Sequence, residues 1–211
     1  MPESLTTLLT LLIANDDLHA RWLNSLSLME NTGARKIARY EHPVHTNLTI
    51  LKHAAEEARH AYYLKKQITR LLGEAGCPDY SYRYLLAPKH SHHYLRQLDL
   101  DTCRYLKQRG KQGRALYDAA YILVTYAIEV RADELYGVYQ EALTRAGSKV
   151  NVKSIILEEA GHLEEMTRML EAFDPQWQHI AADICAIEDC LYQQWLTAVA
   201  QVVAAEQPVT G

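Results

Sequence analysis

The sequence predicts an all-α protein built on a four-helix bundle, with a long crossover between the second and third helices and an additional C-terminal helix. Apolar residues recur at steps of three and four along long segments, the spacing of a helix face buried in a bundle. Short, long and short connections separate these segments, as in two antiparallel helix hairpins. A Glu and His pattern also occurs once in each expected hairpin, so spacing and motif favour the same architecture.

The first helical region is expected at about residues 4–40, with an interruption near 15–17. Its buried face carries one carboxylate and one glycine among apolar residues: Leu23, Leu26, Glu30, Gly33 and Ile37. His42 and Pro43 should end the region, because proline disfavours helix in the residue before it and donates no amide hydrogen.

The second helix is expected at about residues 46–72, and its face includes two histidines and a glutamate: Ile50, His53, Glu57, His60 and Leu64. Residues 73–113 then lose the helical spacing and become rich in Gly, Pro, Ser, Tyr and His. We expect this segment to be an irregular crossover with one short helix at about 98–109.

The third helix is expected at about 114–146 and carries Glu129 on a largely apolar face, before a turn at Gly147 and Ser148. The fourth, at about 151–173, carries Glu159 and His162 on the most regular apolar face of the chain. A fifth helix follows at 175–205. With no linker in the sequence, residues 1–211 are expected to form a single domain.

Two Glu-x-x-His steps stand out, Glu57 to His60 and Glu159 to His162. Each follows another glutamate by about one hairpin length, because Glu30 precedes Glu57 by 27 residues and Glu129 precedes Glu159 by 30. Four carboxylates and two imidazoles delivered in this way are the ligand set of a di-iron or di-manganese site in a four-helix bundle.

Elementary electrostatics favours metal at such a point. Residues three apart on a helix project to the same side, so each Glu and His pair can reach one ion. Burial of an uncompensated carboxylate costs several kcal/mol, and converging carboxylates also repel one another. Two divalent cations would neutralise four carboxylates. Carboxylate and imidazole ligands suit iron or manganese, whereas structural zinc sites more often use thiolates.

Over residues 16–173 the chain resembles the ferritin-like di-iron carboxylate superfamily, whose six ligand places are filled by Glu30, Glu57, His60, Glu129, Glu159 and His162. The resemblance implies two iron ions, with manganese as an alternative. It also implies that Glu57 and Glu159 bridge the metals and that Glu30 and Glu129 are terminal ligands. It does not identify a member family.

His53 departs from that pattern, because it lies four residues before Glu57 and shares its helix face, where the second half of the chain has Ile155. Two interpretations stay open. A second-shell or partly exposed histidine is favoured, and a seventh metal ligand, similar to that of di-iron arylamine N-oxygenases, is the alternative.

Other polar residues are secondary candidates. Asp133 could orient a ligand histidine, and tyrosines near the ligands could donate a hydrogen bond or an electron, although a core role is favoured for these: Tyr63, Tyr126 and Tyr136. Solvated helix faces are expected for Glu56, Glu158, Glu164 and Glu165. The histidines of the crossover are expected in a polar loop: His90, His92 and His93.

Composition excludes several classes of protein. The 211 residues are 48% hydrophobic, carry a net charge of −4 and have a pI near 6.2, without the basic runs of a nucleic-acid-binding protein. The four cysteines form no C-x-x-C, and no apolar stretch is long enough to span a membrane. We therefore expect a cytoplasmic protein with reduced thiols, no nucleic-acid partner and no membrane partner.

The expected function is that of a non-haem di-iron oxidoreductase that activates dioxygen to hydroxylate or otherwise oxidise a small organic substrate, with an electron donor as a further partner. The ligands alone do not select the reaction. Two alternatives stay open: an iron-binding, ferroxidase-like protein without organic substrate, and a metal-free helical interaction protein. A homodimer is also expected, and two roles stay open for Trp177, Ile180 and Trp195 of the fifth helix: a dimer face, or packing that caps the bundle.

Overall fold

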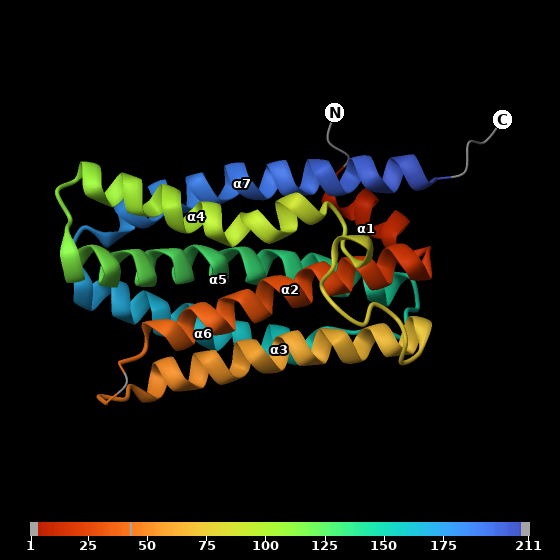
Figure 1. The fold of residues 1–211 in the computed structure, drawn as a ribbon, viewed down its shortest axis with the longest axis horizontal. Coiled ribbons are helices and arrows are strands. Elements are labelled where there is room, and N and C mark those ends of the chain that lie inside the picture. The colour runs from red at the N-terminus through yellow and green to blue at the C-terminus, as the bar shows by residue number, and fades with distance from the viewer. Residues whose placement is uncertain (1–3, 43, 208–211) are drawn as a thin grey trace.

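A computed structural model describes residues 4–42 and 44–207 of the chain (Figure 1). Over these residues it has seven α-helices, one short 3-10 helix and no strand, which confirms the all-α prediction. The elements are α1 (Leu5–Ile13), α2 (Asp16–Tyr40), α3 (Leu48–Leu72), η1 (Tyr82–Tyr84), α4 (Pro88–Gln108), α5 (Gly113–Arg145), α6 (Lys153–Phe173) and α7 (Trp177–Glu206).

The first helical region is two helices, interrupted where the sequence predicted. Asn15 caps the start of α2, because its side-chain oxygen accepts hydrogen bonds from the amides of Asp17 and Leu18 at 3.0 and 3.1 Å. The short α1 buries its leucines against α2, α5 and α7. At the other end α2 stops at Tyr40. The predicted terminator Pro43 lies outside the described residues.

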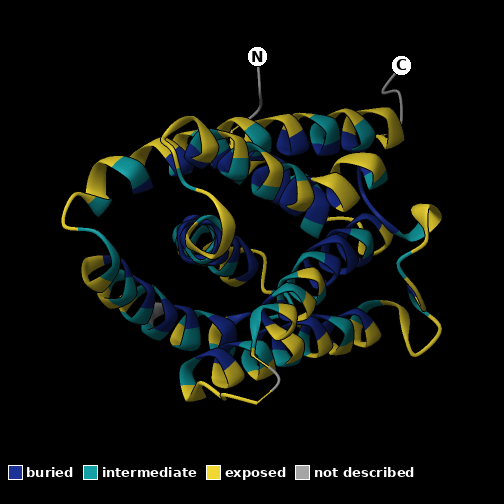
Figure 2. Cartoon of the chain, turned by 60° about the vertical axis from the view of Figure 1, so that its left-hand side comes forward, coloured by how far each residue is buried: buried dark blue, intermediate teal, exposed yellow. Residues whose placement is uncertain are grey.

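Two hairpins, α2 with α3 and α5 with α6, lie side by side, and α4 and α7 lie on the opposite side of α5 from α3 (Figure 1). The middle of α5 is enclosed by other helices, since residues 119–125 are all buried without interruption. A helix buried on every face must lie inside the fold rather than on its surface. Figure 2 shows the same arrangement for the molecule, with buried positions turned inward and exposed positions outward.

The prediction for the crossover is wrong in extent. Helix α4 has 21 residues and begins at Pro88, about ten residues before the short helix expected at 98–109. Pro88 occupies the first turn, where a missing amide hydrogen costs nothing and the fixed φ favours helix. The buried face of α4 keeps helical spacing: Ser91, Tyr94, Leu95, Leu98, Thr102 and Leu106. The polar residues on the exposed face of α4 made that spacing difficult to recognise in the sequence.

Helices α4 and α7 pack on each other and on α5, and α4 also contacts α2 (Figure 1). Trp195 of α7 is only 1% exposed and stacks on Trp22 with ring centroids 5.2 Å apart. It therefore cannot belong to the predicted dimer face, while Trp177 and Ile180 are half-buried against the core. None of the described helices combines the length and apolar character needed to cross a membrane.

Candidate metal centre

The structure brings the six predicted ligands together inside the two hairpins. Glu30 comes from α2, Glu57 and His60 from α3, and Glu129 from α5, while Glu159 and His162 come from α6. Five of them are buried, and Glu30 has only 12% of its side chain exposed. The helical spacing that placed these residues on apolar faces is the reason that they converge.

The six residues form two overlapping groups that could each hold a metal ion. We call the first the His60 position (Glu30, Glu57, His60 and Glu159) and the second the His162 position (Glu57, Glu129, Glu159 and His162). Within each group one ligand atom of every residue lies within 4.8 Å of the others. Glu57 and Glu159 belong to both groups, so each lies where a carboxylate could bridge two ions.

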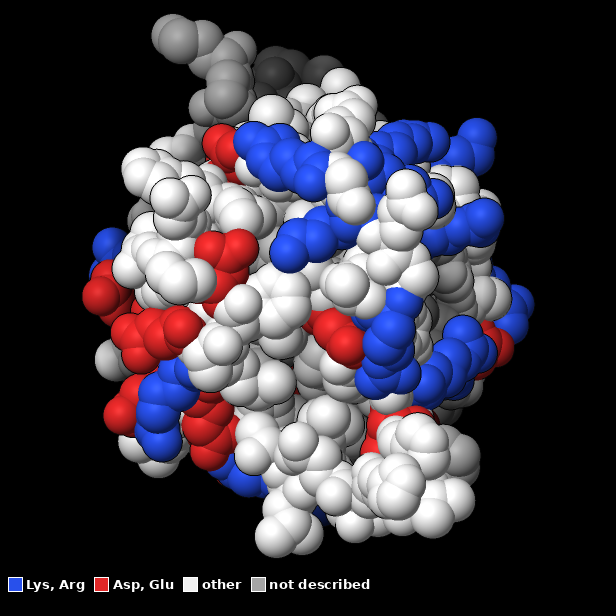
Figure 3. Space-filling view, turned by 90° about the vertical axis from the view of Figure 1, so that its left-hand side faces the viewer, with Lys and Arg blue, Asp and Glu red and all other residues white. Residues whose placement is uncertain are grey.

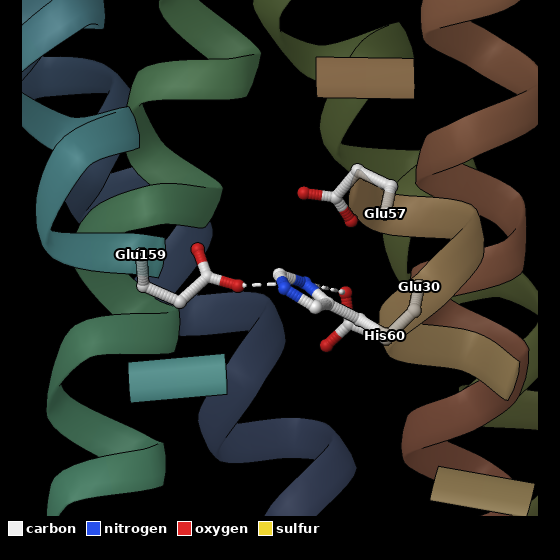
Figure 4. Close-up of side chains that lie close together, drawn as sticks. All are labelled: Glu30, Glu57, His60 and Glu159. Carbon is white, nitrogen blue, oxygen red and sulfur yellow. Dashed lines mark ion pairs between the residues drawn. The ribbon is translucent and has the colours of Figure 1, made fainter. Parts of the chain in front are cut away.

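At the His60 position, the imidazole lies between carboxylates from different helices (Figure 4). Its Nδ1 is 3.0 Å from Glu159 Oε1 and 3.8 Å from Glu30 Oε2. At the His162 position, Nδ1 is 3.5 Å from Glu129 Oε2 and 3.4 Å from Glu159 Oε2. Both histidines therefore present the same ring nitrogen to the carboxylates.

Concentrated charge perturbs the protonation of the group. Burial raises the pKa of Glu57 and Glu129 well above the usual range, and repulsion from neighbouring carboxylates raises it further. Burial would also raise the pKa of Glu159, but interactions with His162 and His60 outweigh it and bring this pKa below the usual range. Without further positive charge, the carboxylates cannot all be ionised at low cost.

The pKa of His162 is raised as well. Burial alone would lower its pKa, but the interactions with Glu129, Glu159 and Glu56 raise it to about 11. In the protein alone, a proton on the His162 imidazole thus balances part of the negative charge of the carboxylate cluster. A metal ion that binds this imidazole would have to displace the proton.

Unsatisfied atoms show that the residues fit a metal. Four atoms facing the cluster are buried without a hydrogen bond of good geometry: His60 Nδ1, His162 Nδ1, Glu129 Oε2 and Glu159 Oε2. Buried polar atoms are normally paired, and each unpaired one costs roughly 1–3 kcal/mol. Four such atoms at one point, all of types that bind divalent iron or manganese, are accounted for together by metal ligation.

Each ligand histidine is held from behind by a glutamate on the opposite hairpin. His60 Nε2 is 3.1 Å from Glu158 Oε2, and His162 Nε2 is 2.8 Å from Glu56 Oε2. This is the carboxylate and imidazole pairing that fixes the orientation of metal-binding histidines. The prediction that Glu56 and Glu158 are solvated is wrong, since 24% and 31% of their side chains are exposed.

These two residues had a signal in the sequence. Each stands directly before a shared glutamate, so the repeated unit is Glu-Glu-x-x-His rather than Glu-x-x-His: Glu56–His60 and Glu158–His162. Asp133, the candidate for an orienting role in the sequence, is exposed on α5 and makes no hydrogen bond to either histidine within the described part of the chain.

His53 lies beside the His162 position but belongs to neither group. It is buried, its Nε2 is 2.7 Å from Glu165 Oε2, and its ring centroid is 4.6 Å from that of His162. Glu165 also binds Lys52 at 2.7 Å, so it is held in an ion pair rather than solvated as predicted. Within the described residues, His53 Nδ1 has no hydrogen-bond partner.

Of the three candidate tyrosines, Tyr136 contacts the centre. Its hydroxyl donates to Glu30 Oε1, and burial followed by the charge of Glu30 raises its pKa well above the usual range. Tyr63 donates to Asn151 at 2.8 Å and Tyr126 packs edge-on to Trp177, so both are structural. The crossover histidines are exposed along α4, in a helix and not in the predicted loop: His90, His92 and His93.

An apolar cavity of about 70 Å³ lies against the carboxylates. Its walls come from α2, α4, α5 and α7 and include Leu26, Met29, Leu95, Ile128 and Trp195, while Glu30, Glu57, Glu129 and Glu159 form its polar side. The α4 helix of the crossover therefore covers one side of the carboxylate cluster.

We compared the chain with models of protein families, with curated proteins and with solved structures, and none of them matches it.

Proposed function

We propose that this chain is a ferritin-like di-iron carboxylate protein that uses dioxygen to oxidise a small organic substrate. The observation that carries the proposal is the pair of overlapping four-residue groups that share Glu57 and Glu159. A metal-free polar network does not account for them, because it would leave buried imidazole and carboxylate atoms unpaired.

Each residue of the two groups would have a distinct role in holding the ions. Glu30 and His60 would complete one ion, Glu129 and His162 the other, and Glu57 and Glu159 would join the two. A pair of ferrous ions bound there would supply electrons to reduce dioxygen. Glu56 and Glu158 keep the imidazoles oriented, and Tyr136 holds the Glu30 carboxylate by a hydrogen bond.

Oxidation of an organic substrate is supported by the apolar cavity on one side of the carboxylates. Water is disfavoured against leucine, isoleucine and tryptophan side chains, and exclusion of water suppresses side reactions during oxidation. A protein that only oxidises iron has no use for an apolar space beside the ions. Ferroxidase-like activity is therefore the second candidate, and it keeps the same ligands.

The test begins with metal content. The purified protein, loaded anaerobically with ferrous iron, should hold about two irons per chain by elemental analysis, and the Glu57→Gln/Glu159→Gln double variant should hold almost none. The Glu164→Gln/Glu171→Gln variant, which alters exposed residues of α6, is the matched control. Wild-type protein that binds neither iron nor manganese would overturn the proposal.

Dioxygen uptake then separates the two reactions. With excess reductant and a library of small organic molecules, an oxidase should continue to consume dioxygen and yield an oxidised product detectable by mass spectrometry. If uptake stops once the added iron is oxidised, and no library member is changed, the ferroxidase-like alternative replaces the organic reaction.

A further inference from the structure

A second hollow, of about 530 Å³, lies between α2, α4 and α5 on the surface. Its charged lining comprises four cations and one carboxylate: Arg35, Lys36, Arg39, Arg96 and Asp99. We call it the basic groove. It is several times larger than the apolar cavity of about 70 Å³ and has the volume of a site for a small molecule.

Three arginines of the basic groove are not neutralised by the protein. Lys36 pairs with Asp99, whereas Arg35, Arg39 and Arg96 are exposed and have no ion pair among the described residues. The chain as a whole carries a net charge of −4, so this local excess of positive charge is contrary to the average. Figure 3, which faces the end where α4 stops and α5 begins, shows Lys and Arg gathered mainly on one side and acidic residues mainly on the other.

A tyrosine with a buried hydroxyl also lines the groove. Tyr121 is only 4% exposed, and its hydroxyl has no hydrogen-bond partner among the described residues. Its ring stacks on Tyr40 with centroids 3.7 Å apart, which fixes it in place. A buried hydroxyl without a partner is costly unless a ligand or ordered water binds it.

The groove leads toward the carboxylates. Leu95 of α4 is buried and lines both the basic groove and the apolar cavity, so the two spaces are neighbours at this residue. On α2, Lys36 lines the groove and Gly33, one turn earlier, lines the cavity. Gly33 has no side chain at a point where a Cβ would lie 3.3 Å from Glu57 Oε2, so the backbone of α2 lies close to this carboxylate.

We infer that the basic groove binds the substrate of the proposed oxidation, and that this substrate is an organic anion with a carboxylate or phosphate group and an apolar body. Arg35, Arg39 and Arg96 bind the anionic group, and the apolar end points past Leu95 toward the metal centre. The role as substrate rests on the proposed function. The binding of an organic anion does not.

The chemistry of the lining selects that class. Guanidinium groups form paired hydrogen bonds with carboxylate and phosphate oxygens, and these bonds are stronger than neutral ones. The aromatic rings of Tyr40, Tyr117 and Tyr121 provide an apolar wall for the body of the molecule. The 70 Å³ cavity is about half the 150 Å³ that holds benzene in an engineered cavity, so only the end of such a body would fit beyond Leu95.

The test uses metal-free protein and 4-phenylbutyrate, phenyl phosphate, inorganic phosphate and the neutral alcohol 4-phenylbutanol as probes, with binding followed by calorimetry and protein NMR. At least one of the two phenyl anions should bind, and whichever binds identifies the anionic group. The alcohol and inorganic phosphate should bind at least about tenfold more weakly than that anion. NMR shifts should include residues 35–39, 92–99 and 121.

Variants locate the binding. Arg35→Gln/Arg39→Gln/Arg96→Gln should weaken the phenyl anion by about tenfold or more, and Tyr121→Phe by about threefold, because a hydrogen bond is lost while the ring remains. The matched control removes the same charge from exposed cations elsewhere, through Lys66→Gln, Arg145→Gln and Lys153→Gln, and should bind as wild type. Both triple variants should retain wild-type metal content and thermal unfolding.

Several results would overturn the inference. Equal binding by inorganic phosphate would reduce the groove to a general basic surface. Equal losses in both triple variants would mean that net charge alone attracts the probe. Binding of a single-stranded oligonucleotide that is lost in the groove variant, with no binding of either phenyl anion, would identify a different partner. Failure of the wild type to bind metal would remove the proposed oxidation but leave this result interpretable.

Discussion

The two positions of the candidate metal centre repeat one another in sequence, yet their surroundings differ. At the His60 position, the terminal Glu30 accepts a hydrogen bond from Tyr136, and the orienting Glu158 also pairs with Arg59. At the His162 position, Glu129 Oε2 has no hydrogen-bond partner among the described residues, and His53 packs against the ligand imidazole.

A repeat in the sequence can therefore produce two positions with different surroundings. The helical spacing of each hairpin fixes which six side chains meet, and it is the same in both halves. Residues outside the repeat then set the charge and hydrogen bonding of each position separately. Variants can remove either a residue that the two positions share or a residue that differs between them.

The largest effect is expected for the shared carboxylates. Glu57→Gln or Glu159→Gln should lower the metal content from about two ions per chain to well below one, because each residue belongs to both groups. Glu30→Gln and Glu129→Gln remove a ligand from one position only and should leave about one ion. Elemental analysis after anaerobic loading distinguishes these cases, and a shared-carboxylate variant that keeps two ions would contradict the overlap.

The metal-free protein should lose stability as pH rises. The pKa of His162 is raised to about 11 from an ordinary value of 6.5, so its contribution is complete below pH 6.5 and declines toward pH 11. The raised pKa values of Glu57 and Glu129 act in the same direction, because the folded chain holds protons that the unfolded chain has released above pH 4.5.

Metal binding must displace those protons, so its affinity should increase about tenfold per pH unit for each proton released. Thermal unfolding of metal-free and loaded protein between pH 6 and 9 should therefore show a gap in Tm that widens with pH. For metal-free protein, His162→Gln should flatten the dependence, and His90→Gln on the exposed face of α4 should not. A pH-independent gap would contradict the protonated state described for the metal-free centre.

The orienting glutamates test whether each imidazole is held independently. Glu56→Ala should weaken the His162 position and Glu158→Ala the His60 position, each by about 10–100-fold, the usual cost of losing such a partner. Titration with ferrous or manganous ions should then show one weakened and one unchanged step. Glu164→Ala, an exposed glutamate of α6 paired with Arg168, is the control. Equal weakening of both steps would mean that the positions are not separable.

The sequence was sufficient for the six converging residues because a helical face is a property of local spacing. Glu30 and Glu129 are informative through burial, since a carboxylate among apolar neighbours requires a partner. Glu56 and Glu158 were not predicted, because a carboxylate among polar neighbours does not by itself indicate that it needs a partner. They lie on the adjacent, more polar face, and only the packing of α3 against α6 turns that face toward a histidine.

The fold was predictable for long helices and less so for the crossover. Helices α2, α3, α5, α6 and α7 begin and end within about two residues of the predicted bounds. In α4, the residues between its buried positions are mostly His, Arg, Gln and Asp, a composition shared by exposed helix and loop. The basic groove combines α2, α4 and α5, so no single segment of sequence contained it.

His53 of the first half has no counterpart in the second half, because the matching residue there, Ile155, is buried and apolar. As a neighbour held by Glu165, it should contribute modestly, so His53→Leu should change the affinity of the His162 position by less than about tenfold and leave two ions bound. If His53 is a seventh ligand, the same variant should change the coordination number seen by X-ray absorption. Glu165→Gln, which releases His53 without removing it, separates orientation from ligation.

The smallest effect concerns Gly33, which occupies the place that Ala132 fills in the other half, three residues after the terminal glutamate. Gly33→Ala would make the halves alike. Its Cβ would lie 3.3 Å from Glu57 Oε2, so the shared carboxylate must shift by a few tenths of an ångström.

Two consequences of this substitution have opposite signs. Alanine in place of glycine inside α2 should stabilise the metal-free protein by up to about 1 kcal/mol, which raises Tm by roughly 2–4 °C in a chain of this size. The shifted carboxylate should weaken metal binding by a few fold. Ala132→Gly is the reciprocal variant and should lower Tm without changing affinity. Tighter metal binding by Gly33→Ala would show instead that the missing side chain leaves Glu57 too loosely held, and would assign Gly33 to access rather than to ligand geometry.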